Sequence, residues 1–415
     1  MKKRVVILGG GTGGTLAANR LRRELPDDVT ITVVDRDDDH LYQPGLLFVP
    51  FGLARPESLV RSRSRQLHRG VGYCQSAVDH VDIDGRRVYL ADGTTAPYDV
   101  LVVATGAALR PGETEGLTEA LTSGRVFSFY EPSGAAGLRD ALARFDGGRI
   151  AINVVDMPIK CPVAPIEFSF LTDWYFQQRG IRDKVELTFV TPLDGAFTRA
   201  VCNRELSGLL TGKHIELATE FNTGQVDADG GKLISFDGRE VGFDLAVVVP
   251  VHGGAAYVDR SPGLGDALGF VPTNERTLQS TVRPDIFVIG DAADLRASKA
   301  GSVAHFEGEV LVRNIVSYLA GQPLSEAFDG HTNCFIESGF GKALLIDFNY
   351  ATEPVPGHFP GPVGLPLLKE SRLNHLGKLA FQHFYWHLLL PGHDVPGLSA
   401  SMPRAGKNLA AAAKN

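Results

Sequence analysis

The 415-residue sequence predicts an α/β fold with two domains built on parallel sheets, the second inserted into the first. Short β-branched runs at residues 4–8 and 149–155 are typical of buried parallel strands, one for each domain. Two further apolar runs, residues 98–103 and 285–289, each end in a small-residue turn. We expect the following parts: a first domain of residues 1–108 and 280–328, a second of 109–279, and a C-terminal region of 329–415 with a hairpin and an amphipathic helical segment.

Composition excludes several classes of protein. Hydrophobic residues make up 44% and charged residues 21% of the chain, as in ordinary globular proteins. The net charge of -7 argues against nucleic acid as a partner. The apolar stretch after the basic start is only about four residues long, so we expect no cleavable signal peptide. Four cysteines without metal-ligand spacing predict neither a disulfide scaffold nor a metal site.

The first strand, residues 4–8, runs directly into a glycine-rich loop. Gly9, Gly11 and Gly14 supply a G-x-G-x-x-G motif, and residues 15–25 follow with helical periodicity. The first glycine permits the tight turn, the second lets the backbone approach a pyrophosphate, and the third packs the helix on the strand. We expect Thr12 and the helix N-terminus to complete this phosphate site.

An acidic residue stands where a ribose would need it. A second strand, residues 29–34, ends at Asp35, about 20 residues beyond the last glycine of the motif. Its carboxylate is predicted to accept hydrogen bonds from ribose hydroxyls. Together with the glycine loop, this predicts a Rossmann-like dinucleotide site.

The two later strand ends narrow the choice of dinucleotide. The turn at Thr105 and Gly106 and the turn at Gly290 and Asp291 resemble signatures of flavoproteins with two dinucleotide-binding domains. The resemblance implies FAD, with Asp291 on the ribityl chain. We also assign Val78, in a strand-like stretch, to the cofactor site.

The second domain lacks a nucleotide fingerprint. Its first strand, residues 149–155, is followed by ten residues that include three prolines and no glycine. Proline has a fixed φ and adds bulk where a pyrophosphate needs close backbone approach. We therefore expect no nicotinamide nucleotide to bind there in the usual way.

A cysteine stands in the place of that glycine loop. Cys161 precedes an expected helix of residues 167–178, with Pro165 suited to the first turn, and it follows Lys160. A helix N-terminus and a neighbouring cation both lower a thiol pKa, so we expect a reactive thiolate. Glu167 is close enough in sequence to exchange protons with it. The alternative is a small buried structural cysteine.

The cysteine segment carries a specific resemblance. Residues 160–167 are similar to the K-C-P-x-A-P-x-E segment of sulfide:quinone oxidoreductases, and Cys334, in a predicted hairpin of residues 333–347, matches that family's second redox cysteine. The resemblance implies that Cys161 and Cys334 form a disulfide or sulfur-bridged pair beside FAD. Sulfide would be oxidised to sulfane sulfur or polysulfide, and the electrons would pass to membrane quinone.

Two further features follow from the same resemblance. Lys299 resembles a family lysine near the flavin and quinone. Several members carry a third cysteine before the second domain, in some of them bound covalently to FAD. Residues 126–131 contain no cysteine here, so FAD is predicted to be non-covalent.

The C-terminal region predicts contact with a membrane surface. Residues 366–415 hold six Lys/Arg and two acidic residues, a net +4. An apolar stripe predicts a helix lying among lipid headgroups, and hence a peripheral (monotopic) protein on the cytoplasmic membrane. The stripe consists of Leu373, Leu376, Ala380, Phe384 and Leu388. The alternative is a helix packed on the core or in a homo-oligomer interface.

Three other functions remain open from the sequence. A flavoprotein sulfide dehydrogenase that reduces a cytochrome c partner would share the cysteine pair. A type II NADH:quinone oxidoreductase fits the C-terminal segment but needs the missing nucleotide fingerprint. A non-catalytic flavin redox sensor would use the Cys161 and Cys334 state as its signal.

Overall fold

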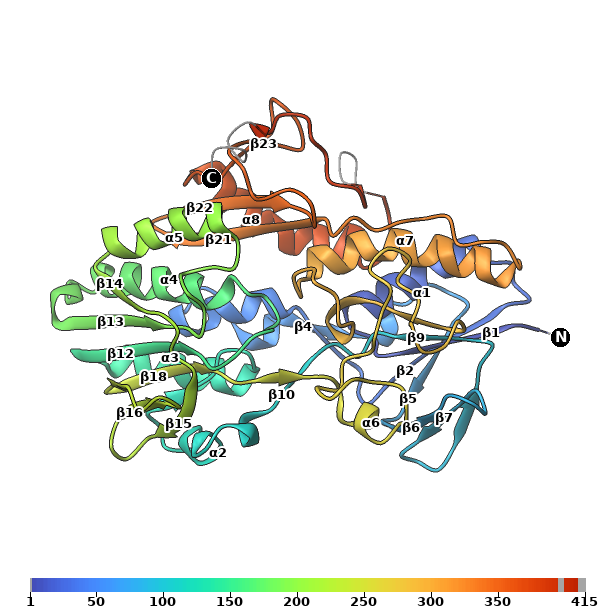
Figure 1. Cartoon of the computed structure of the whole chain (residues 1–415), viewed down its shortest axis with the longest axis horizontal. Coiled ribbons are helices and arrows are strands. Elements are labelled where there is room, and N and C mark those ends of the chain that lie inside the picture. Colours follow the sequence, from blue (N-terminus) through green and yellow to red (C-terminus); the bar gives the residue numbers. More distant parts are fainter. Residues whose placement is uncertain (1, 395–398, 410–415) are drawn as a thin grey trace.

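Two parallel sheets form the body of the protein. The structure is a computed structural model that describes residues 2–394 and 399–409. Figure 1 shows the two sheets next to each other, with the N-terminal one on the right and the inserted one on the left, and the C-terminal segment lying across them. Met1 and the end of the predicted basic tail, including Lys414, lie outside the described residues.

The first sheet has the strand order β20-β9-β1-β2-β5, with all neighbours parallel. Its helices α1 and α7 pack against each other, and a small antiparallel sheet with the short helix α6 lies beside it. The bounds are β1 Arg4–Leu8, α1 Thr12–Glu24, β2 Thr30–Asp35, β5 Val71–Gln75, β6 Val78–Asp82, β7 Arg87–Leu90, β8 Thr95–Pro97, β9 Val100–Val103, α6 Ala256–Asp259, β20 Ile286–Val288 and α7 Gly301–Leu319.

The second sheet repeats this plan in the order β11-β18-β12-β13-β14, again with parallel neighbours. Its longest strand, β12, takes the central place that β1 takes in the first sheet. The bounds are β11 Val126–Phe127, α3 Pro132–Arg144, β12 Gly148–Val154, α4 Ala164–Gln178, β13 Val185–Val190, α5 Ala200–Gly212, β14 Ile215–Ala218, β15 Thr223–Asp227, β16 Lys232–Ser235, β17 Glu240–Gly242 and β18 Leu245–Val249.

The chain crosses between the sheets twice, and the two crossings pair. Strands β10 (Ala108–Leu109) and β19 (His252–Gly253) form a two-stranded antiparallel ribbon. The second sheet is therefore an insertion in the first, which confirms the predicted fold class. The remaining short elements among the described residues are β3 Asp39–Leu41, β4 Val60–Ser62, α2 Leu117–Ala120 and six 3₁₀ segments, Gln43–Phe51, Pro56–Leu59, Ser64–Gln66, Pro111–Glu113, Arg182–Lys184 and Gly290–Ala292.

The C-terminal region begins with a hairpin, as predicted. Strands β21 (Thr332–Gly339) and β22 (Lys342–Phe348) pack between α4 and α8, a helix of Arg372–Phe384 that continues into a π-helical turn at Tyr385–Leu389. Strands β23 (Gly357–Phe359) and β24 (Leu365–Leu367) form a second, shorter ribbon. Among the described residues, no helix is both long and apolar enough to cross a membrane.

The outer face of α8 is apolar. Leu373, Leu376 and Phe384 of the predicted stripe are exposed, whereas Ala380 and Leu388 are half-buried. Leu379, which is not part of the predicted stripe, is also exposed. The opposite face carries buried Asn374, and Tyr385 and Trp386 follow it into the core. The helix thus packs on the protein along one side and leaves a second apolar side uncovered within the chain.

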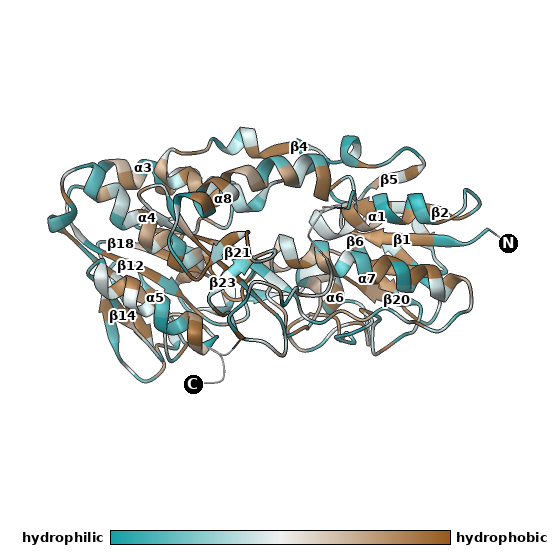
Figure 2. Ribbon diagram, turned by 90° about the horizontal axis from the view of Figure 1, so that it is seen from above, coloured by the Kyte–Doolittle hydropathy of each residue, from teal (hydrophilic) through white to brown (hydrophobic). Residues whose placement is uncertain are grey.

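The interior is apolar as the strand sequences require. Figure 2 shows β1 hydrophobic along most of its length, while the helices carry hydrophilic residues between their apolar positions. The largest core cluster joins residues of the second sheet, α4, the hairpin and the end of α8, and both Cys161 and Cys334 pack against it. The second domain and the C-terminal region therefore share one core, which fixes the two cysteines relative to each other.

Candidate active site

The glycine loop has the close contacts and the open space that a phosphate site needs. A Cβ on Gly14 would lie 1.8 Å from the Gly9 carbonyl oxygen, so only glycine allows α1 to pack on β1 here. Gly9 has φ +91°, which suits glycine. A Cβ on Gly11 would meet no atom within 4 Å. The helix begins at Thr12, three residues before the predicted start, so its N-terminus faces this open space.

Asp35 ends β2 beside this loop, as predicted. Its Oδ2 accepts the N–H of Gly10 at 2.7 Å and also contacts the guanidinium of Arg63. Its Oδ1 accepts the N–H of Arg36 at 2.7 Å. Arg63 is buried and its side chain lies over Gly10, a contact that the sequence analysis missed because 53 residues separate the two. The arginine adds a positive charge to the predicted ribose and phosphate region.

The turns after β9 and β20 lie together because the two strands are neighbours. Gly106 and Gly290 both have positive φ, +69° and +71°. Lys299 Nζ donates to the carbonyl oxygens of Asp291 (2.8 Å) and Ala293 (2.7 Å), which holds the second turn. Thr105 Oγ1 lies 3.3 Å from the hydroxyl of Tyr257.

Asp291 fits the predicted role of binding a polyol chain. Burial raises the pKa of its carboxyl group, although Lys299 and Lys160 oppose that shift. Within the residues that the structure describes, its carboxylate oxygens have no hydrogen-bond partner, so they are available to a cofactor hydroxyl. Val78 begins β6, is half-buried and packs with the core of the first sheet. Its contact with a cofactor stays a prediction.

Cys161 lies at the end of the loop that replaces the second glycine fingerprint. It adopts a left-handed backbone conformation, with φ +52°. Its N–H donates to the carbonyl oxygen of Lys299 at 2.6 Å, and its own carbonyl accepts from Ala164, the first residue of α4, at 2.9 Å. The loop therefore connects the second domain directly to the Lys299 segment of the first. The cysteine precedes a helix N-terminus, as the sequence predicts.

Cys334 reaches the same region from β21. Both cysteines are free thiols and retain a small exposed surface. Protein atoms nevertheless surround each sulfur closely enough that burial is the largest influence on its pKa. The charge of Cys334 contributes to the pKa of Cys161, so the two sulfurs are close enough to interact electrostatically.

The prediction of a low pKa for Cys161 is wrong. Burial raises the pKa of Cys161 well above its ordinary value, and the negative charges of Glu167 and Cys334 raise it further. Lys378 and the N–H of Ala164 act in the opposite direction but do not prevail. Burial likewise raises the pKa of Cys334 to about 12. In the reduced protein both groups are thus thiols at neutral pH.

Lys160 does not serve as the cation beside the sulfur. Its ammonium group lies over the ring of Tyr130, 6.0 Å from the centroid, and interacts with Asp291 and Glu131. Burial lowers the pKa of Lys160. The lysine that faces the cysteines is Lys378 of α8. No signal in the sequence pointed to Lys378, because its contact with Glu167 joins residues that are 211 positions apart.

The outer edge of β21 is closed by side chains instead of a third strand. Ser302 Oγ donates to the carbonyl oxygen of Asn333 at 2.6 Å. Glu167 Oε1 accepts the N–H of Glu337 at 2.6 Å and also contacts the Nζ of Lys378. These bonds satisfy edge groups that would otherwise be buried unpaired. They also fix Glu167, whose charge acts on the pKa values of both thiols.

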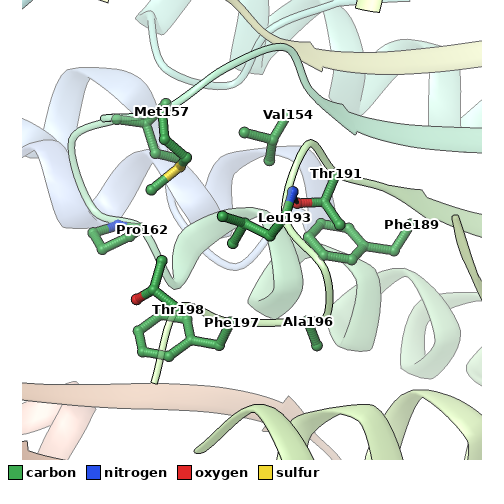
Figure 3. Close-up of a pocket in the computed structure, with 10 residues that line it drawn as sticks. Val154, Met157, Pro162, Phe189, Thr191, Leu193, Ala196, Phe197 and Thr198 are labelled. Carbon is green, nitrogen blue, oxygen red and sulfur yellow. Dashed lines mark hydrogen bonds between the residues drawn. The ribbon is translucent and has the colours of Figure 1, made fainter. Parts of the chain in front are cut away.

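The carboxyl ends of β12 and β13 enclose only a small cavity. Its volume is about 10 Å³, roughly that of one water molecule. Figure 3 shows Met157 and Pro162 of the Cys161 loop on one side and Phe197 and Thr198 on another. In an open α/β sheet this is the usual place for a ligand. Here side chains fill it.

The comparisons with known proteins agree with this geometry. Residues 3–308 match the model of the pyridine nucleotide-disulphide oxidoreductase family. The mitochondrial sulfide:quinone oxidoreductase of Dictyostelium discoideum is 28% identical over 395 residues, covering 94% of this chain and 86% of that protein. The mouse (Mus musculus) mitochondrial enzyme of the same name is 26% identical, with the same coverage.

A solved structure has the same fold along nearly the whole chain. The sulfide:quinone oxidoreductase of Aquifex aeolicus superposes with a TM-score of 0.80 at 21% identity, covering 94% of this chain and 92% of that one. A type II NADH:quinone oxidoreductase of Mycobacterium tuberculosis is 36% identical, but over only 26% of this chain. The resemblance to sulfide:quinone oxidoreductases is thus confirmed, and the chain belongs to the pyridine nucleotide-disulphide oxidoreductase family, as an oxidoreductase with a flavin-type cofactor.

Proposed function

We propose that this protein binds FAD non-covalently, oxidises sulfide to sulfane sulfur or polysulfide through Cys161 and Cys334, and passes the electrons to membrane quinone. One observation carries the proposal. Two cysteines from separate parts of the chain lie close enough to interact electrostatically, with a buried carboxylate and a buried lysine beside them. A structural cysteine needs no charged neighbours in a core.

The residues around the first sheet fit FAD. Gly9, Gly11, Thr12 and Gly14 would hold the pyrophosphate at the N-terminus of α1, and Asp35 would bind the adenosine ribose. The cofactor residues on the other side are Val78, Thr105, Gly106, Gly290, Asp291 and Lys299. Bound FAD supplies a two-electron acceptor. No cysteine stands where some relatives attach the flavin, which supports a non-covalent site.

The sulfur chemistry starts from an oxidised cysteine pair. Hydrosulfide attacks the Cys161 sulfur, a new S–S bond forms there as a persulfide, and the Cys161–Cys334 bond breaks. Cys334 leaves with the electron pair as a thiolate. Lys378 stabilises that negative charge, since its ammonium group lowers the pKa of Cys334. Glu167 exchanges the proton that sulfide carries, because its carboxyl group lies among the same groups.

The apolar face of α8 supports a membrane-bound quinone as the acceptor. The helix that contributes Lys378, α8, also exposes four apolar side chains: Leu373, Leu376, Leu379 and Phe384. A peripheral protein that lays this face among lipid headgroups on the cytoplasmic membrane would bring the site close to the quinone. The exposed face fits a homo-oligomer interface equally well. Vesicle binding distinguishes a membrane-binding face from a subunit interface.

The alternatives fit the structure less well. A type II NADH dehydrogenase would need a glycine loop after β12 for the nucleotide pyrophosphate, where this chain has three prolines and Cys161 instead. A cytochrome c partner would not need the apolar face of α8. A redox sensor would not need Glu167 and Lys378 beside its cysteines.

The test is anaerobic flavin spectroscopy on the purified protein. Sulfide should bleach the flavin, a soluble quinone should restore its absorbance, and NADH should do neither. Cys161→Ser and Cys334→Ser should each abolish bleaching while retaining the flavin, and Cys74→Ser should behave as the wild type. Bleaching by NADH but not by sulfide would overturn the proposal. Bleaching by sulfide with turnover only on cytochrome c would select the second function.

A further inference from the structure

Four ionisable side chains, two carboxylates, a lysine and a histidine, lead from the cysteines to the surface. Glu167 contacts Lys378, and His375 Nδ1 lies 2.9 Å from both carboxylate oxygens of Glu337. The side chains of Glu167 and Glu337 are each only 2% exposed, whereas that of His375 is 25% exposed. The row therefore begins beside the thiols and ends in solvent.

The fold fixes the relative positions of these four side chains. His375 and Lys378 are three residues apart in α8, so they share one helix face. That face lies on β21, which contributes Glu337, and the N–H of Glu337 is itself bonded to Glu167. Burial alone would lower the pKa of Lys378, but the charges of Glu167, Glu337 and Cys161 together raise it. The ammonium group is thus electrostatically coupled to both carboxylates.

Two buried carboxylates in one contact region are costly, and α8 could pack on the hairpin with apolar residues alone. The charged groups facing this row come from every element around it. They are Cys161 in its loop, Glu167 on α4, Cys334 and Glu337 on β21, Asp347 on β22, and Lys378 and His375 on α8.

The proposed reaction requires a proton from solvent. Oxidation of HS⁻ to sulfane sulfur releases two electrons and one proton, whereas reduction of a quinone to a quinol takes two electrons and two protons. One proton per turnover must therefore enter from water. His375 is the partly exposed member of the row, and an imidazole can bind a proton at one ring nitrogen and release one from the other.

We propose that His375 and Glu337 form the solvent end of a proton path that reaches Glu167 by way of Lys378. The proposal rests on the function proposed above. The proton binds His375 Nε2 from solvent, and Nδ1 passes a proton to the Glu337 carboxylate. Lys378 exchanges protons between that carboxylate and Glu167. The proton taken from solvent, together with the one that HS⁻ releases, is consumed when the quinone takes two electrons and two protons and becomes the quinol. Each transfer leaves the net charge of the row unchanged except for the proton taken up at His375 and given up at Glu167.

The first arm of the test is steady-state turnover of sulfide with a soluble quinone across pH 6–9. His375→Gln should lower kcat by about tenfold or more at the alkaline end, and added imidazole should restore it, because the small base replaces the missing ring. Glu337→Gln should lower kcat similarly without rescue. His80→Gln is the matched control, since it removes an exposed histidine–carboxylate pair on β6. It should leave both kcat and the pH profile unchanged.

The second arm does not depend on turnover. Infrared spectroscopy after a pH jump follows protonation of the buried carboxyl group of Glu167, assigned by its loss in Glu167→Gln. His375→Gln should slow that signal about tenfold. Unchanged infrared rates in both His375→Gln and Glu337→Gln overturn the proton path, whatever the turnover. If the wild type shows no sulfide turnover but the infrared signal slows as expected, the proposed function fails and the path stands.

Discussion

The hydroxyl of Tyr385 lies 2.7 Å from the hydroxyl of Thr12, although 373 residues separate the two in the chain. The same hydroxyl lies 2.7 Å from His40 Nε2, and His40 Nδ1 lies 3.1 Å from the carbonyl oxygen of Gly10. All three side chains contact the glycine loop or its helix. The end of the C-terminal helix is thereby joined to the predicted phosphate site.

Removal of this hydroxyl should loosen both segments. Tyr385→Phe leaves His40 and Thr12 without a buried partner, so we expect the free energy of unfolding to fall by about 1–3 kcal/mol. The purified variant should also retain less flavin. Urea unfolding and the flavin-to-protein absorbance ratio measure the two effects. Tyr89→Phe, on β7, is the control, and equal behaviour of the two variants would contradict the link.

The glycine loop predicts opposite outcomes for two similar substitutions. Gly14→Ala places a methyl group 1.8 Å from the Gly9 carbonyl oxygen, so the α1–β1 contact must open, at a cost of roughly 3 kcal/mol or more. Gly11→Ala meets no atom, so the protein should fold normally but lose affinity for flavin. Thermal unfolding and flavin titration separate the cases. Gly208→Ala in α5, also unobstructed, should be neutral or stabilising by up to about 1 kcal/mol.

Alkylation rates test the raised pKa values of the cysteines. In the reduced protein at pH 8, Cys161 and Cys334 should react with iodoacetamide far more slowly than the same residues in urea, because only the thiolate reacts. Glu167→Gln removes a negative charge and should speed alkylation of Cys161. Lys378→Gln removes the cation and should slow it. Mass spectrometry of each cysteine reads the rates, and the opposite order for the two variants would be inconsistent with the structure.

Stability should fall in acid through His40. Burial, together with the charge of Arg63, lowers the pKa of His40 from 6.5 to about 4. Between these values the unfolded chain binds more protons on this residue than the folded protein, so stability is lost as the pH falls from 6.5 to 4. The shift corresponds to about 3 kcal/mol.

His40→Gln should therefore flatten the dependence of stability on pH. Urea unfolding at pH 7.5 and pH 5 measures the difference for the variant and the wild type. Some slope should remain in the variant, because burial also lowers the pKa of His252 to about 4 and that of His305 to about 3. An identical slope in both proteins would show that His40 does not titrate in this window.

The apolar face of α8 predicts weaker membrane binding after a charge is introduced. One variant is Leu376→Glu, at a position that is 60% exposed. A second variant is Leu379→Glu, also at an exposed position of α8. Both should reduce co-sedimentation with anionic vesicles while soluble-quinone turnover is retained. Phe236→Glu, at an 82% exposed position in the second domain, is the control. A change of oligomeric state without loss of vesicle binding would favour the subunit-interface alternative.

Local patterns were enough to predict the fold class. The glycine loop, the strand-end turns and the glycine turn of the hairpin each lie within a short segment, and short segments determine whether a helix or strand forms. The helices α1 and α4 begin three residues earlier than predicted, because Thr12 and Ala164 already belong to the first turn. The domain boundaries and the roles of the site residues stay predictions.

The pKa of Cys161 shows where local reasoning fails. The sequence places the cysteine beside Lys160 and before a helix, and both features favour a thiolate. The fold turns Lys160 toward Tyr130 and encloses the sulfur with Glu167 and Cys334. Desolvation and nearby negative charge are properties of the assembled site, so they cannot be predicted from the residues next to Cys161 in the sequence.

The sequence by itself determined the two Rossmann-like sheets, the place of the glycine loop, and the two cysteines that carry the family resemblance. Only the tertiary structure decided which groups meet at the two sites. Lys378 contacts Glu167 and His375 contacts Glu337 near the cysteines, whereas Arg63 contacts Asp35 and Tyr385 contacts Thr12 at the glycine loop. The physical reason is the separation along the chain over which each kind of interaction acts. Helix and strand formation depends on residues a few positions apart, whereas hydrogen bonds and charge interactions depend on distances in space that are set when α8 and the hairpin pack on both domains.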